Sequence, residues 1–327
     1  MRIIVMGTGP FAVPMLDAIL AAGHDVPAVV TRPRAAPHGR KKPLPNPMRE
    51  AAEQHALTIL DPPDINHQDA QAQLIPLKPD LLAVCDFGQL LSSSTLSVAR
   101  LGGINLHGSL LPKYRGAAPV QWALIQGEPL TGVTVIHMTT QLDGGPTLCQ
   151  RETPIDPCET AVELENRLAQ LGAPAVVEAI DILAHWNGTT ELGIQQDNQH
   201  ATLAPRLQKQ QGNINWTATS TEIINLHRAL QPWPGCFTHW QRPSGEPLRL
   251  IIKGIEMVAD TDAISRTAQT NPGTILGKIN PEAAPGLWVA TGDGYLSITR
   301  LQPAGKRVMD IDEFQRGYPL QEGDALG

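Results

Sequence analysis

The strongest constraint on the fold is the opening of the chain, where a short β-branched run meets a glycine turn. Ile3–Met6 form the run, Gly7-Thr8-Gly9 follows, and an apolar-periodic stretch comes next. This order predicts a strand, a tight turn and a helix. Further apolar runs at 26–30, 81–85 and 103–106 are continuous rather than alternating. Strands of that kind are covered on both faces, so we predict a doubly wound, Rossmann-like α/β domain.

The rest of the chain predicts a second, smaller domain. With 327 residues the chain exceeds one compact domain, which typically has roughly 100 to 200. Composition turns to Gly, Thr, Gln, Asn and His after the first domain, and beyond it short strand candidates alternate with Gly and Pro. The run at 133–138 alternates and predicts an antiparallel addition to the first sheet. We predict an α/β domain at 1–188, a linker at 189–208 and a small β-barrel domain at 209–327.

Composition argues against a membrane span, a signal peptide and a metal site. No run of about 18 uninterrupted apolar residues occurs, and glycines and prolines break the apolar N-terminus. The four cysteines show no Cys-x-x-Cys pair and no matching histidine spacing; they are Cys85, Cys149, Cys158 and Cys236. We therefore expect no metal, no disulfide framework and a cytoplasmic location.

Positive charge is concentrated in one segment of an acidic chain. The net charge of −7 taken alone argues against a nucleic-acid partner. Between residues 31 and 49, however, every charged side chain is basic. These are Arg32, Arg34, Arg40, Lys41, Lys42 and Arg49. Such a segment is either a solvated loop or a contact for phosphates.

The glycine turn leaves three interpretations open. Gly7-x-Gly9-x-x-Ala12 formally satisfies a dinucleotide fingerprint, but the second predicted strand ends in Thr31-Arg32 rather than in the acidic residue that holds a ribose. Arg32 or Arg34 could instead accept the 2′-phosphate of NADP. The turn could equally be structural, letting the first helix pack close to the sheet, or form the wall of a pocket for another cofactor.

Asn105 and His107 are the first candidates for chemistry. They lie two residues apart at the end of a predicted strand, so both side chains point to the same side. A histidine can move a proton near pH 7, an amide can donate to a developing oxyanion, and a carboxylate such as Asp143 can orient the imidazole. A surface or core histidine and a turn-capping asparagine explain the same residues equally well. The residues alone leave both interpretations open.

A long motif extends this pair. Asn105-Leu106-His107-Gly108-Ser109-Leu110-Leu111-Pro112-Lys113-Tyr114-Arg115-Gly116-Ala117-Ala118-Pro119 is followed by Gly132-Val133-Thr134 and Leu142-Asp143-Gly144-Gly145-Pro146. Together with the opening Gly-Thr-Gly-Pro-Phe-Ala-Val-Pro, these segments resemble the folate-dependent formyltransferase family. The resemblance implies that Asn105, His107 and Asp143 are the catalytic residues.

The resemblance also implies a substrate pair. Formyl would pass from the cosubstrate 10-formyltetrahydrofolate to the amino group of methionyl initiator tRNA, in a monomer without a metal. The residues expected to contact folate are Phe11, Phe87, Gly88, Leu90, Ser109, Leu110, Leu111 and Pro112.

Features outside the shared catalytic segment favour the tRNA-acting members of the family. They are Gly116–Gln121, the run from Ala204 to Trp216, and Pro232-Trp233-Pro234-Gly235 with the β-rich tail. In those members an OB-like C-terminal barrel helps hold tRNA and a basic insertion contacts the acceptor stem. We therefore expect Arg40, Lys41 and Lys42 to bind tRNA.

Alternatives and departures remain. A sugar-nucleotide N-formyltransferase shares the chemistry, an NADP-dependent oxidoreductase shares the glycine turn, and a non-catalytic tRNA-binding protein would follow if Asp143 were misplaced. The family commonly shows Asp-Thr-Gly where this chain has Asp143-Gly144-Gly145, and Ala-Tyr-Gly where it has Asp86-Phe87-Gly88.

Overall fold

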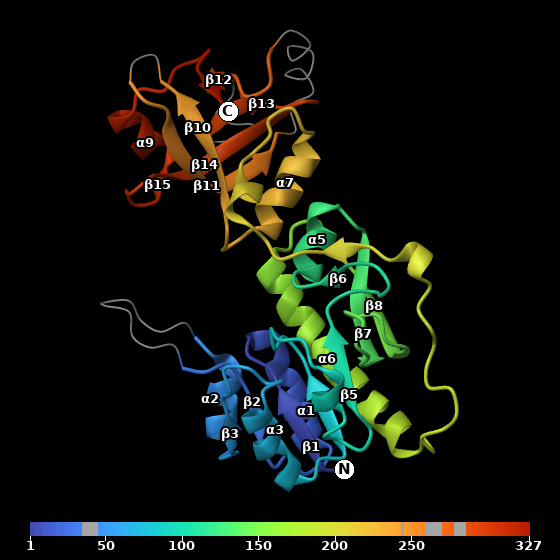
Figure 1. The fold of residues 1–327 in the computed structure, drawn as a ribbon. Helices are drawn as coiled ribbons and strands as arrows, with labels where there is room; N and C mark the ends of the chain where they lie inside the picture. The colour runs from blue at the N-terminus through green and yellow to red at the C-terminus, as the bar shows by residue number, and fades with distance from the viewer. Residues whose placement is uncertain (35–44, 243–244, 259–269, 278–285) are drawn as a thin grey trace. The chain divides into compact units, whose positions relative to one another are not determined.

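The structure is a computed structural model that describes residues 1–34, 45–242, 245–258, 270–277 and 286–327 (Figure 1). The chain divides into two compact units. Unit 1 comprises Met1–Ala123, Pro129–Pro157 and Glu163–Arg206, and unit 2 comprises Leu124–Glu128, Cys158–Val162 and Leu207–Gly327. Arg40, Lys41 and Lys42 lie outside the described residues. The boundaries at 188 and 208 stay a prediction.

Unit 1 is built on a seven-stranded mixed sheet. Its strands are β1 (Ile3–Met6), β2 (Val29–Val30), β3 (Ile59–Leu60), β4 (Leu81–Val84), β5 (Gly103–His107), β7 (Leu130–His137) and β8 (Thr147–Pro154). Their order is β3-β2-β1-β4-β5-β7-β8. The first five pair in parallel, and β7 and β8 add antiparallel strands. The predicted doubly wound α/β fold and the antiparallel addition are both confirmed.

Helices accompany this sheet. They are α1 (Val13–Ala21), α2 (Pro47–Gln54), α3 (Gln68–Leu74), α4 (Ser93–Leu96), α5 (Pro119–Ile125) and α6 (Ala161–Ala184). All residues of β1 and β4 are buried, as continuous apolar strands require. The long helix α6 approaches β5 closely, because a Cβ atom built on Gly172 would lie 2.8 Å from a methyl carbon of Leu106.

Residues 194–204, which we call the strap, continue unit 1 beyond α6. Ile194 forms an antiparallel bridge with Thr147 at the start of β8. The strand β9 (Leu203–Ala204) pairs in parallel with β6 (Arg115–Gly116). Composition predicts a linker over 189–208; within that range, the strap is bound to unit 1.

Unit 2 contains a nearly closed antiparallel barrel. Its strands are β10 (Cys236–Gln241), β11 (Leu248–Met257), β12 (Ile275–Gly277), β13 (Leu287–Ala290), β14 (Tyr295–Pro303), β15 (Met309–Asp310) and β16 (Ala325–Leu326). The order is β12-β13-β14-β11-β10-β16, with β15 on β14, and a bridge between Thr274 and Ala325 joins the two ends. The predicted small β-barrel is confirmed.

The described part of this unit includes the helices α7 (Ser220–Ala229) and α9 (Ile311–Gly317). Thr219 and Glu222 form a capping box at the start of α7, because each side chain bonds the backbone N–H of the other residue. Trp288 and Phe314 are fully buried in the unit. Across the described ranges, every helix is too short or too polar to span a bilayer.

Candidate active site

Asn105 and His107 lie on β5, at the carboxyl end of the parallel part of the sheet. Asn105 is paired with Val84 on β4 and with Ile136 on β7, so the strand holds it from both sides. His107 is almost completely buried, with 5% of its surface exposed. Residues two apart on a strand face the same side, and both side chains are directed at Asp143.

The carboxylate of Asp143 joins the two strand residues. Its Oδ1 atom lies 3.5 Å from Nδ2 of Asn105, and its Oδ2 atom lies 3.8 Å from Nδ1 of His107. The backbone N–H of Gly116 donates to Oδ2 over 2.8 Å. Asp143 adopts a left-handed backbone conformation with φ +46°, which is uncommon for a residue other than glycine. The structure therefore brings the three predicted catalytic residues together.

The opposite nitrogen of the His107 ring fixes its proton arrangement. Nε2 lies 2.8 Å from the backbone carbonyl oxygen of Tyr114, which can only accept a hydrogen bond. Nε2 therefore carries hydrogen and donates it. Nδ1, which faces Asp143, is the nitrogen that can gain and lose a proton, and the carboxylate would stabilise the charged ring.

A small pocket of about 50 Å³ opens beside this cluster. Asn105, Asp143 and the predicted folate contact Leu90 line it together. Leu90 is 68% exposed, so a ligand could cover a large apolar surface there. The lining residues that sequence reasoning missed are Ile136, Met138, Thr139, Thr140, Gln141 and Leu142. They come from the end of β7 and the loop after it, where the motif offered no charged or catalytic side chain as a signal.

The predicted folate contacts at 109–112 form a tightly bonded turn. The Thr134 hydroxyl donates to the carbonyl of Ser109 over 2.6 Å and accepts from the backbone N–H of Leu111 over 3.1 Å. The Ser109 hydroxyl is buried and donates to the carbonyl of Lys113. Leu110 and Pro112 are partly exposed at the same turn. Ser109 and Leu111 are the buried residues of this turn.

The glycine turn after β1 packs closely against the end of β4. A Cβ atom on Gly7 would lie 2.6 Å from that of Ala12, and one on Gly9 would lie 1.8 Å from Oδ2 of Asp86. Both contacts fit the structural interpretation of this turn. Phe11 lies beyond it on a short 3₁₀ helix at Pro10–Ala12, and its ring approaches Gly108.

Two carboxylates near this turn, those of Asp86 and Glu165, have raised pKa values. Asp86 reaches solvent, yet desolvation raises its pKa, while a hydrogen bond from Gly9 and the charge of Arg32 oppose the rise. Desolvation also raises the pKa of Glu165; a hydrogen bond from Gln121 lowers it and the charge of Asp86 raises it further. The neighbouring residues differ in exposure, since Phe87 is buried in the apolar core and Gly88, at φ +82°, is exposed.

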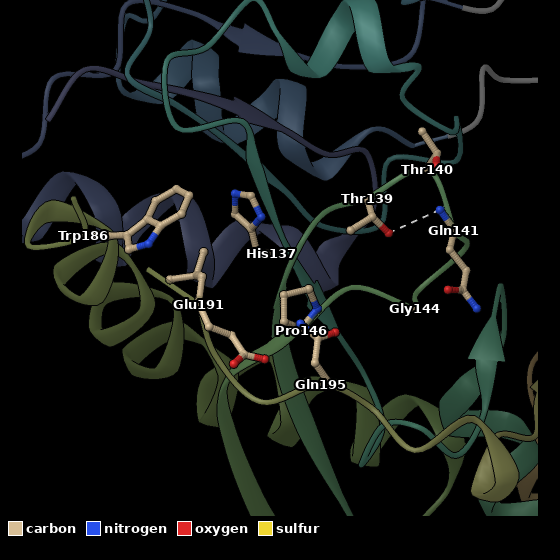
Figure 2. Close-up of a pocket in the computed structure, with 10 residues that line it drawn as sticks. His137, Thr139, Thr140, Gln141, Gly144, Pro146, Trp186, Glu191 and Gln195 are labelled. Atoms are coloured by element: carbon tan, nitrogen blue, oxygen red, sulfur yellow. Dashed lines mark hydrogen bonds between the residues drawn. The ribbon is translucent and has the colours of Figure 1, made fainter. Parts of the chain in front are cut away.

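The loop that carries Asp143 also borders a larger pocket of about 580 Å³ (Figure 2). His137 and Trp186 meet edge to face there, with ring centroids 5.9 Å apart. The two pockets share Thr139, Thr140 and Gln141. A Cβ atom on Gly144 would lie 2.4 Å from Cδ of Gln141, so the glycine that replaces the family's threonine leaves room for that side chain.

Gln196 and Arg115 are polar residues of the site that sequence reasoning missed. The Gln196 amide donates to the backbone carbonyls of Asp143 and Gly145, over 2.8 and 2.7 Å. Arg115 is 6% exposed and donates to the Gln196 side-chain oxygen. Arg115 stands within the motif, but Gln196 falls in a segment whose polar composition predicts a linker, so no local signal marks it.

The described part of the basic segment is partly neutralised. Arg34 forms an ion pair with Glu53, and Arg49 forms one with Asp61, each at 2.6 Å. Arg32 donates to the carbonyl of Pro45. The described flanks of the basic segment therefore bond to acidic side chains and to the backbone of the α/β unit.

Comparisons with known proteins cover both units. Residues 1–180 match the formyl transferase family, and residues 206–319 match the formyl transferase C-terminal domain. The chain is 44% identical over 337 aligned residues to a methionyl-tRNA formyltransferase of Rhodopirellula baltica, with 100% of this chain and 96% of that protein covered.

Solved structures share the fold at low identity. HypX from Aquifex aeolicus, in complex with tetrahydrofolic acid, aligns with a TM-score of 0.62 at 15% identity. The alignment covers 100% of this chain and 50% of HypX. The sugar 3N-formyl transferase WlaRD aligns with a TM-score of 0.58 at 18% identity, covering 94% of this chain and 99% of WlaRD. At these identities the likeness supports the fold alone.

A formyl transferase catalytic domain on an α/β sheet, followed by a C-terminal barrel of the matching kind, defines a two-domain formyl transferase. This class does not include the dinucleotide-dependent oxidoreductases, so the NADP alternative is set aside. Since its similarity extends over whole proteins, the chain belongs to the methionyl-tRNA formyltransferase family.

Proposed function

We propose that Asn105, His107 and Asp143 catalyse transfer of the formyl group of 10-formyltetrahydrofolate to the amino group of methionyl initiator tRNA. The product is formylmethionyl-tRNA for translation initiation. The observation that carries the proposal is the single Asp143 carboxylate, which lies within 3.8 Å of both His107 and Asn105 beside a pocket. The enzyme would act as a monomer in the cytoplasm.

The reaction begins when the neutral methionyl amine attacks the formyl carbon. A C–N bond forms, the carbonyl π electrons move to oxygen, and a tetrahedral oxyanion results. Asn105 has two amide hydrogens, and only one is directed toward Asp143. The other can donate to the oxyanion, which stabilises the charge as it develops.

Collapse of this intermediate needs proton movement. The attacking nitrogen must lose a proton, and the folate nitrogen must gain one as its bond to the formyl carbon breaks. Nδ1 of His107 can accept the first proton and deliver it to the leaving nitrogen, so protons balance within the site. Asp143 would stabilise the imidazolium during the transfer, and the Tyr114 carbonyl would keep the ring oriented.

The folate cosubstrate would lie against Leu90 and the loop that ends at Asp143. The apolar lining suits an aromatic ring system, and the backbone and side-chain polar groups of the loop suit its nitrogen and oxygen atoms. Phe11, Gly88 and Leu110 would supply further contacts. The buried residues at this edge would shape the wall from behind; these are Phe87, Ser109 and Leu111, with the partly exposed Pro112 beside them.

The tRNA would be held by positive charge. Arg40, Lys41 and Lys42 stand in the part of this acidic chain richest in basic residues. Their side chains would contact acceptor-stem phosphates, which position a nucleic acid without reading its sequence. The barrel domain would support the same substrate.

An acceptor assay tests the proposal. The protein would be given 10-formyltetrahydrofolate and either methionyl initiator tRNA or an amino-sugar nucleotide. We expect formylation of the tRNA only. Formylation of the sugar alone would overturn the choice of acceptor, and an inactive protein that still binds tRNA would overturn the catalytic assignment.

A further inference from the structure

We propose that Gln196, held by the buried guanidinium of Arg115, is a positioning residue that sets the location of Asp143 for catalysis. The inference rests on the proposed role of Asp143. It assigns a function to the strap, which bonds both the loop around Asp143 and the turn at Tyr114.

The Gln196 side chain is fixed at both ends. Its nitrogen donates to the carbonyl of Asp143 over 2.8 Å and to the carbonyl of Gly145 over 2.7 Å. Its oxygen accepts from Nε and a terminal nitrogen of Arg115, over 3.1 and 2.7 Å. A flipped amide would place oxygen against two carbonyls and nitrogen against a cation. Only one orientation is therefore compatible with these partners.

Arg115 stabilises this orientation of the Gln196 amide. It is 6% exposed, and a buried guanidinium must keep its acceptors because its charge cannot be removed by deprotonation. Asn198 of the strap provides a further acceptor at 2.9 Å. The β6–β9 pairing places Arg115 opposite Leu203, so the strap is anchored beside the bonds that it supplies.

The loop around Asp143 needs such support. Asp143 occupies the left-handed region at φ +46°, a conformation that persists only where surrounding contacts determine it. Gly145 packs so closely on the carbonyl of His137 that a Cβ atom would lie 1.8 Å from it. Gln196 binds the two carbonyls that flank Gly144, so it fixes the loop where the carboxylate turns toward His107.

The strap also holds the other side of the His107 ring. The backbone N–H of Tyr114 donates to the Thr202 hydroxyl over 2.8 Å, and the carbonyl of Tyr114 accepts from Nε2 of His107. Both partners of the imidazole are therefore bonded to one segment. Loss of Gln196 should displace Asp143 and leave the Tyr114 contact in place.

The test compares Gln196→Glu, which keeps an acceptor for Arg115 but loses both donors, with Gln196→Met, which loses all of these bonds. The matched control is Gln199→Glu, an exposed side chain three residues further along. Formylation is measured at saturating 10-formyltetrahydrofolate over a range of methionyl-tRNA concentrations. Thermal melting is recorded for each variant. We expect both Gln196 variants to keep a wild-type KM for tRNA and to lose about 10- to 100-fold in kcat. The control should retain wild-type kcat.

A double-mutant cycle with Asp143→Asn separates positioning from general destabilisation. If Gln196 acts through Asp143, adding Gln196→Glu to Asp143→Asn should lower kcat less than about 2-fold further. Independent, multiplicative losses would overturn the inference, as would full activity of both Gln196 variants. Full activity of Asp143→Asn alone would instead refute the proposed catalytic role, so the two failures are distinguishable.

Discussion

Nε2 of His107 donates a hydrogen bond to the carbonyl oxygen of Tyr114 over 2.8 Å, and this contact directs the other ring nitrogen toward Asp143. The two nitrogens of this buried imidazole therefore have different roles. One is held as a donor, and one is available for proton exchange.

Replacement of His107 tests this division of roles. A glutamine at this position can still donate to Tyr114 but cannot exchange a proton near pH 7. We expect His107→Gln to reduce kcat by about 10²- to 10⁴-fold, the usual contribution of a general acid or base. Activity is measured in the tRNA formylation assay, with the exposed His185→Gln as control. A loss below about 3-fold would contradict proton transfer by His107.

Asn105→Ala removes the proposed oxyanion donor. One such donor typically contributes on the order of 10²- to 10³-fold in rate, so kcat should fall by that factor. The side chain is only partly buried, so the melting temperature should stay close to that of the wild type. Asn271→Ala, at an exposed position of the barrel unit, should have no effect. Near-normal turnover of Asn105→Ala would remove Asn105 from the mechanism.

Gly9→Ala should destabilise unit 1, because the new methyl group would lie 1.8 Å from Oδ2 of Asp86. Overpacking of this kind costs about 1 to 3 kcal/mol, measurable by urea unfolding. Since the family commonly has alanine at position 86, Asp86→Ala should restore most of the lost stability. Gly317→Ala, which has open space around the added methyl, serves as control. The explanation fails if the double variant is no more stable than Gly9→Ala.

The stability of unit 2 should depend on pH through His227. The pKa of His227 is lowered from 6.5 to about 4. Burial is the main cause and the charge of Lys253 adds to it, while a hydrogen bond with the Ile252 backbone opposes the shift. Between about pH 4 and pH 6.5, His227 binds a proton in the unfolded chain but not in the folded chain. The stabilisation is thus complete above pH 6.5 and is lost as pH falls toward 4, by at most about 3 kcal/mol.

Urea unfolding at about pH 7.5 and about pH 5, on either side of the ordinary histidine pKa, measures this effect. We expect His227→Gln to lose less stability between the two conditions than the wild type does. His239→Gln, a partly exposed histidine of β10, should keep the wild-type difference. An unchanged pH dependence in His227→Gln would show that other groups govern the acid sensitivity.

Substitution of Arg40, Lys41 and Lys42 by alanine should weaken tRNA binding in a salt-dependent way. Each phosphate contact that is lost should reduce the slope of log KM against log salt by about 1. The kcat at saturating tRNA should be retained. Arg100→Ala, an exposed arginine paired with Asp80, tests for a general charge effect. A slope equal to that of the wild type would indicate that these residues do not contact phosphates.

The sheet could be predicted from sequence because its strands are buried on both faces. Apolar runs such as Ile3–Met6 and Leu81–Val84 need no knowledge of distant partners to be recognised. By contrast, β8 (Thr147–Pro154) has mostly exposed or partly exposed residues and depends on pairing with β7. Local pattern likewise does not mark the strand β10 or the helix α9, because tertiary packing determines them.

The site was predictable only where the chain itself supplies the geometry. A spacing of two residues on a strand places Asn105 and His107 on one face, whatever surrounds that strand. The position of Asp143 required the resemblance, and Gln196 lies 53 residues beyond it in sequence. A glutamine that bonds backbone carbonyls carries no local signal, because its partners are groups that every residue has.

The strap has a consequence for synthesis of the protein on the ribosome. Asn105, His107 and Asp143 emerge early, but the bonds from Gln196 and Thr202 that hold the two neighbouring turns come from a later part of the chain. The α/β sheet can therefore assemble before its site has its final arrangement. The full set of these bonds can form only after residue 204 has left the exit tunnel, because β9 pairs with β6 through Leu203 and Ala204.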